Sequence, residues 1–166
     1  MSTSGLLTGH RWSVETDAIS VLLRTELSAC ETYRTAIREM EKDSDCPALS
    51  LRCLYRSHRR FADELRGLAR RQGGLPAESA GTSGLWSGVH ERIAELPGHA
   101  NFRAILRALR QGERYSLELA RSSLLDPEGP LAAFAKGKLV EGITANIALL
   151  EALERSAEDD PEDPAA

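Results

Sequence analysis

The 166-residue chain lacks any long apolar run. No stretch approaches the roughly 18 apolar residues that a membrane-spanning helix needs, and residues 1–12 lack the apolar segment of a secretion signal. We therefore expect a cytoplasmic protein with no membrane partner. The three cysteines, Cys30, Cys46 and Cys53, are odd in number and form no C-x-x-C pair. That pattern indicates neither a disulfide framework nor a structural zinc site.

Strand signals and familiar catalytic motifs are also missing. Lys136-Gly-Lys138 lacks the glycine spacing of a phosphate-binding loop, and no serine has a recognisable His and Asp partner. What is present is an ordinary globular composition, with 42% hydrophobic and 28% charged residues. The length suits one domain with a substantial core.

Apolar residues follow the period of helices over four long segments. The predicted helices cover residues 13 to about 43, 47 to about 72, 102 to about 125 and 131 to about 156. Residues 1–12 are expected to form a flexible leader, and residues 157–166, which include five acids, a disordered tail. The domain is thus predicted to span residues 13–156.

The connections between these segments predict a topology. The first two and the last two helices are joined by short turns, whereas residues 75–99 separate the middle pair and hold only a short helical piece near residues 85–96. This order predicts an all-α, ferritin-like four-helix bundle with a long crossover between its second and third helices. An up-and-down bundle is the alternative, but it needs no such crossover.

Polar residues interrupt the apolar stripes at similar depths. Glu26 and Tyr33 lie in the stripe of the first helix, His58 in the second and Glu113 in the third. A carboxylate among apolar positions needs a partner, because burying a lone charge is costly. We predict that these side chains meet.

Two motifs resemble those of ferritin-like metal proteins. Glu26 followed by Tyr33 resembles the first-helix motif of bacterioferritins and rubrerythrins, and Gly112-Glu113 resembles the Gly-Glu that opens the ligand motif on the third helix of rubrerythrins. The layout from Ser13 to Ser156 also resembles a bacterial family of ferritin-like bundles of unknown function. The residues that carry this resemblance are Glu31-Thr-Tyr33-Arg34, His58 with Phe61-Ala-Asp-Glu64-Leu65, Gly73-Gly74-Leu-Pro76, Trp86 and Gly112-Glu113.

The resemblance implies iron or another divalent metal at Glu26, His58 and Glu113, and a role in stress physiology. Three of six ligand positions are filled, because Tyr55, Ile143 and Asn146 stand where the family pattern has Glu, Glu and His. Tyr33, Tyr55 and Asn146 are expected around the ligands.

Charge and coordination favour a degenerate site without a cofactor in a non-enzymatic protein. Two divalent ions bring a charge of +4, whereas Glu26 and Glu113 return −2 and offer few oxygens to hard cations. One alternative is a metal-dependent oxidoreductase with a single zinc or iron on Glu26, His58 and Glu113. Rotation of the fourth helix would add Glu141 to the ligands. Another alternative, without metal, is that Glu113 accepts a hydrogen bond from Tyr33 or His58.

Arginines form a row on one face of the third predicted helix, namely Arg103, Arg107, Arg110 and Arg114. Residues 47–72 of the second helix carry seven further arginines. If these helices were neighbours, one side of the bundle would be basic and could serve an interaction module with an anionic partner. The alternative is a solvated face paired with nearby acids. A net charge of −4 argues against a nucleic-acid binder. A homo-oligomer is left open.

Overall fold

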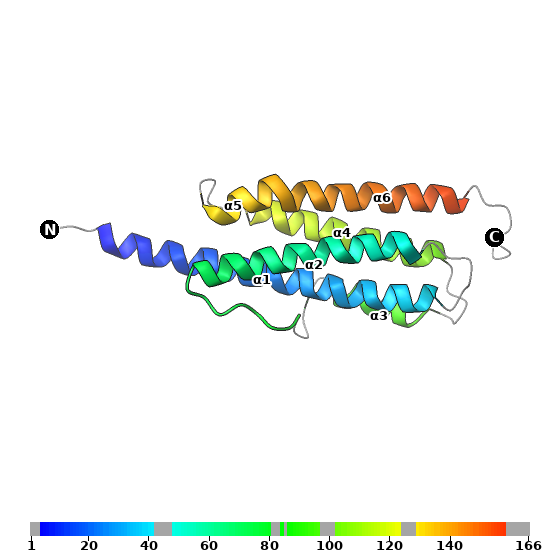
Figure 1. Cartoon of the computed structure of the whole chain (residues 1–166), viewed down its shortest axis with the longest axis horizontal. Coiled ribbons are helices and arrows are strands. Elements are labelled where there is room, and N and C mark those ends of the chain that lie inside the picture. Colours follow the sequence, from blue (N-terminus) through cyan, green and yellow to red (C-terminus); the bar gives the residue numbers. More distant parts are fainter. Residues whose placement is uncertain are drawn as a thin grey trace.

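The computed structural model describes residues 4–41, 48–80, 84, 86–96, 102–123 and 129–158. Within these residues the protein is helical and has no strand, which confirms the predicted all-α class. The helices are α1 (Ser4–Met40), α2 (Ala48–Arg71), α3 (Ser87–Ala94), α4 (Phe102–Ser122), α5 (Pro130–Phe134) and α6 (Val140–Glu158). A π-helical turn, η1 (Ala135–Leu139), joins α5 to α6 without a break (Figure 1).

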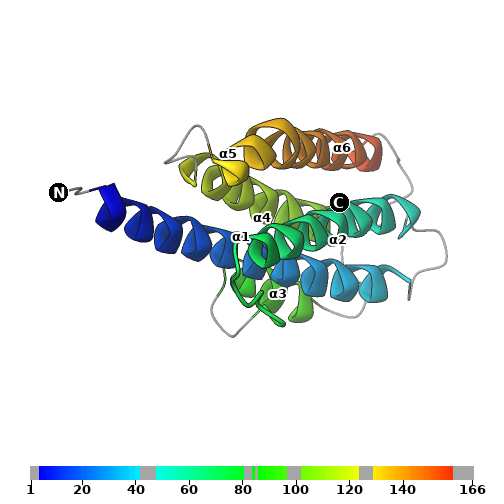
Figure 2. The ribbon, with the colours of Figure 1, turned by 60° about the vertical axis from the view of Figure 1, so that its left-hand side comes forward.

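The long helices pack side by side along one common direction (Figures 1 and 2). α1 packs on α2, α4 packs on α6, and α1 also contacts α3 and α4. α1 and α6 run one way while α2 and α4 run the other way (Figure 1). Because α2 and α4 run in the same direction, the segment between them must bring the chain back along the length of the molecule. α3 lies in that segment and packs against α1 and α4.

Two boundaries differ from the sequence-based predictions. α1 begins at Ser4, so residues 4–12, expected as a flexible leader, already belong to the helix. The segment contains no proline that would stop a helix, and Ser13, expected as the cap, continues it. At the other end α6 includes residues 157 and 158, and the remainder of the predicted disordered tail, residues 159–166, lies outside the described residues.

The end of α2 and the start of α5 have clear local causes. α2 ends where Gly73 adopts a φ of 71°, which few other residues adopt without strain. The amide of Gly74 then donates to the carbonyl of Ala69 at 2.9 Å, which caps the helix. α5 opens with Pro130, and the next amide, that of Leu131, donates to Oε1 of Glu15 at 3.0 Å. This hydrogen bond ties the start of α5 to α1.

The apolar core consists of two clusters along the molecule. One includes Leu22 and Leu23 of α1, Phe61 and Leu65 of α2, and Ile143 of α6. The other joins the second half of α1 to the first halves of α2 and α4, to α3, and to Leu150 of α6. On α2, α4 and α6, His58, Glu113 and Asn146 fall between the residues of the two clusters, and on α1 Glu26 lies where the first cluster adjoins the second. The core therefore has a polar layer between two apolar ones.

Candidate functional site

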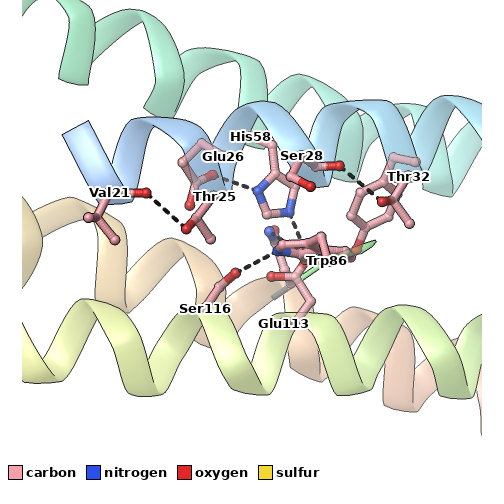
Figure 3. A network of polar contacts seen from close by, with 11 residues as sticks. Val21, Thr25, Glu26, Ser28, Thr32, His58, Trp86, Glu113 and Ser116 are labelled. Carbon is pink, nitrogen blue, oxygen red and sulfur yellow. Dashed lines mark hydrogen bonds and ion pairs between the residues drawn. The ribbon is translucent and has the colours of Figure 1, made fainter. Parts of the chain in front are cut away.

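The polar layer is built around the imidazole of His58 on α2. Its Nδ1 lies 2.7 Å from Oε2 of Glu26 on α1, and its Nε2 lies 2.8 Å from Oε1 of Glu113 on α4. Figure 3 shows the ring held between the two carboxylates. The sequence prediction that Glu26, His58 and Glu113 come together therefore agrees with the geometry.

Glu113 is the centre of the hydrogen bonding. Its Oε1 also accepts a hydrogen bond from the hydroxyl of Tyr33 at 2.6 Å and one from Nδ2 of Asn146 at 3.3 Å. α1, α2, α4 and α6 thus each contribute a side chain. The other oxygen, Oε2, is buried and has no hydrogen-bond partner in the described part of the chain. Glu113 thus contacts both Tyr33 and His58, the two hydrogen-bond partners considered above.

Trp86, in the segment between α2 and α4, closes the site. It is fully buried, and its Nε1 donates to Oγ of Ser116 at 2.9 Å (Figure 3). Its ring centroid lies 5.7 Å from those of both Tyr33 and His58. Gly112 provides the space for this ring, because a Cβ there would lie 2.5 Å from it. The glycine before Glu113 thus has a packing role that the sequence motif did not reveal.

The network is sealed from solvent, which affects its protonation. Glu26 is 1% exposed, and His58 and Glu113 are not exposed at all. Burial alone would lower the pKa of His58, but the charges and hydrogen bonds of Glu113 and Glu26 outweigh burial and raise this pKa to about 10. Burial raises the pKa of Glu26, although His58 opposes the shift. These contacts favour the protonated, positively charged form of the His58 ring.

The pKa of the Tyr33 hydroxyl, which donates to Glu113, is shifted as well. Burial, followed by the charge of Glu113 and the hydrogen bond to it, raises the pKa of Tyr33 well above its ordinary value. Tyr33 therefore remains a hydrogen-bond donor over the whole pH range in which proteins are normally studied.

Two buried threonines of α1 satisfy their hydroxyls locally, since Thr25 and Thr32 donate to the carbonyls of Val21 and Ser28, four residues earlier (Figure 3).

This arrangement does not suit a metal. A histidine ligand offers an unprotonated ring nitrogen to the ion, whereas both nitrogens of His58 face carboxylates. Glu26 and Glu113 approach different nitrogens, so the three groups do not surround a common point. Among the described residues, no group of three or more His, Cys, Asp or Glu side chains could hold a metal ion. Glu141 is exposed on α6 and does not add a ligand.

Tyr55 and Asn146, both expected beside the ligands, have different positions. Asn146 joins the network through Glu113. Tyr55 instead accepts hydrogen bonds from Arg34 at an exposed site between α1 and α2. Ser116 accepts a hydrogen bond from Trp86, a role that the sequence did not predict. Its position on the inward stripe of α4 is the sequence signal that could have indicated this role.

The arginine row of α4 faces the acids of α6. Nε of Arg110 lies 3.2 Å from Glu154, and Nη2 of Arg114 lies 3.4 Å from Glu151. Arg103 donates to the carbonyl of Ala157, while Arg107 is exposed. Since α2 packs chiefly on α1 and α4 on α6, the rows of α2 and α4 do not merge into the single basic side considered from the sequence.

Comparison with known proteins gives no relative. No protein-family model matches the chain, and no curated protein or solved structure is significantly similar to it. Within its described residues, the chain has no helix that combines the length and hydropathy needed to cross a membrane.

Proposed function

We propose that the protein is a non-enzymatic, ferritin-like four-helix bundle in which an imidazolium replaces the metal of a degenerate di-metal site. One observation carries this proposal: the two ring nitrogens of His58 are each bound by a carboxylate from a different helix. The positive ring lies between the two negative groups. A metal ion in a carboxylate-bridged site would have that position.

The directions of the helices support the ferritin-like topology. α1 and α6 run against α2 and α4 (Figure 1), and a long crossover containing α3 connects the middle pair. In ferritin-like metal proteins all four helices of the bundle supply inward ligands at one level. Here Glu26, His58, Glu113 and Asn146 have the corresponding inward positions on α1, α2, α4 and α6.

The burial of the site supports a role without catalysis. Catalysis needs a substrate to reach the reacting groups, whereas His58, Glu113 and Trp86 are not exposed at all. A buried charged network of this kind favours one register among the helices, because any slip leaves a buried charge without its partner. The network thus holds four helices in a defined arrangement.

Metal analysis of the native protein tests this proposal. The protein is purified without a chelating tag, and its iron, zinc and manganese contents are measured by mass spectrometry. We expect well under one ion per chain, and no change in thermal unfolding on addition of manganese or of a chelator. About one or two bound ions per chain would overturn the proposal.

His58→Ala is the matched control. Loss of the imidazolium leaves Glu26 and Glu113 facing a cavity without a cation, so this variant should gain affinity for manganese while the native protein shows none. Manganese should then raise the unfolding temperature of the variant alone. If the variant does not fold, the metal content of the native protein still decides the question.

A second candidate function, the binding of one divalent metal ion, is favoured by one oxygen atom of Glu113. Oε2 of Glu113 is buried without a hydrogen-bond partner in the described part of the chain, and a cation would satisfy it. Cobalt titration tests this candidate through the absorption bands of the bound ion. Binding that is lost in Glu113→Gln would favour it, and absence of bands in the native protein would exclude cobalt binding at this site.

A further inference from the structure

An open pocket of about 700 Å³ lies between α1 and α2 and extends to α3. It is distinct from the buried network, since Glu26, His58 and Glu113 do not line it. The groups that matter here are four guanidinium groups and two rings: Arg34, Arg38, Arg52, Arg56, Tyr55 and His90. Three helices thus direct basic side chains toward one space.

Two of these arginines are held in place by uncharged partners. Nη2 and Nε of Arg34 donate to the hydroxyl of Tyr55 at 3.0 and 3.3 Å, and the guanidinium lies 5.5 Å from the centroid of the Tyr55 ring. Nη2 of Arg38 donates to Oγ1 of Thr35 at 3.0 Å. Neutral partners fix the direction of a guanidinium without cancelling its charge, and each fork keeps further N–H groups for a ligand.

The pocket has a surplus of positive charge. Two acids, Glu31 and Glu41, line it against the four arginines, and Glu41 forms an ion pair with Arg52. In the part of the chain that the structure describes, Arg34, Arg38 and Arg56 form no such ion pair, although the carboxylate of Glu31 interacts electrostatically with Arg34. The arginines of α4 differ, because Arg110 and Arg114 are bound to Glu154 and Glu151. An anion is therefore attracted to this pocket rather than to α4.

We propose that this pocket binds an oligophosphate group. Phosphate oxygens match the forked N–H groups of arginine, and such charge-assisted hydrogen bonds are among the strongest that proteins form. Several separated guanidinium groups suit a chain of phosphates better than one phosphate. The volume lies in the range of small-molecule sites. Because Arg34 already covers the ring of Tyr55, the phosphates, and not a nucleobase stacked on this ring, provide the recognition.

Calorimetric titration of the full chain at low salt tests this proposal. The probes are phosphate, pyrophosphate and ATP. We expect pyrophosphate and ATP to bind with affinities within about threefold of each other, and phosphate to bind at least about tenfold more weakly. Affinity should fall as salt is added. Binding of ATP without pyrophosphate would overturn the proposal, because it would assign recognition to the nucleoside; absence of binding by all three would overturn it as well.

Arg34→Gln and Arg38→Gln test whether the pocket is the site. Each should weaken pyrophosphate binding by about tenfold, the loss expected for one charge-assisted contact. Arg70→Gln is the control, since Arg70 is an exposed residue of α2 outside the pocket and its replacement removes the same charge. Equal losses in all three variants would show that only net charge matters, and would overturn the assignment.

Tyr55→Phe tests the positioning of Arg34 separately. This variant keeps every charge but removes the hydroxyl that accepts from Arg34. We expect pyrophosphate binding to weaken by about threefold to fivefold, with the metal content of the protein unchanged. Affinity equal to that of the native protein would contradict a role for Tyr55. The metal analysis of the buried network is independent of this result, so the two proposals can fail separately.

Discussion

Raising the pH from about 7 to about 9 is expected to destabilise the protein through His58. The folded protein raises the pKa of this histidine from 6.5 to about 10. A raised pKa means that the folded state binds the proton more tightly than the unfolded state does. The stabilisation is therefore complete below the ordinary pKa and is lost as the pH rises through the folded pKa.

The magnitude follows from the proton count. Between the two pKa values the folded state holds one proton that the unfolded state has released, so the free energy of unfolding falls by about 1.4 kcal/mol per pH unit. From pH 7 to pH 9 the loss is about 3 kcal/mol, a large fraction of the stability of a typical domain.

Urea unfolding followed by circular dichroism measures this loss. The matched control is the double variant Glu26→Gln, Glu113→Gln, which keeps His58 and the shape of the site but removes both carboxylates. Burial then lowers the pKa of His58, so the ring is neutral from pH 7 upward. The free energy of unfolding of this variant should change little between pH 7 and pH 9.

A native free energy of unfolding that stays constant between pH 7 and pH 9 would refute the reasoning. If the double variant does not fold, nuclear magnetic resonance of the native His58 ring provides a second measurement. Both ring nitrogens should remain protonated at pH 9, whereas an ordinary histidine loses its proton near pH 6.5. Titration of the ring near that ordinary value would also refute the account.

Three further predictions concern packing and helix ends. Gly112→Ala should lower the free energy of unfolding by about 1–3 kcal/mol in urea, because its Cβ would overlap the Trp86 ring; Gly137→Ala, whose Cβ would have no neighbour within 4 Å, should cost nothing. Gly73→Ala should cost about 1 kcal/mol because of its positive φ, and an unchanged urea midpoint would contradict this. Glu15→Ala should cost about 1 kcal/mol by removing the acceptor at the start of α5, and a smaller loss on Asp17→Ala is the control.

The periodicity of the sequence predicted much of the fold, because each long helix buries a continuous stripe and ends at residues that cannot continue it. Gly73 ended α2 close to the predicted position, and the predicted start of the third long helix coincides with that of α4 at Phe102. The start of α1 was missed because residues 4–12 have no clear apolar stripe. The π-helical turn η1 was also missed, because a turn that contains one extra residue has no distinctive amino-acid composition.

What the sequence alone determined is that Glu26, His58, Glu113 and Asn146 lie on the inward faces of helices, because helical spacing fixes the face of every residue. Which atoms meet depends on how four helices pack, and helical spacing does not specify it. Only the tertiary structure placed both nitrogens of His58 against carboxylates and closed the site with Trp86. It also paired Arg110 and Arg114 of α4 with carboxylates and left Arg34 and Arg38 of the pocket beside α3 with uncharged partners, because charge pairing depends on distances between helices that are remote in sequence.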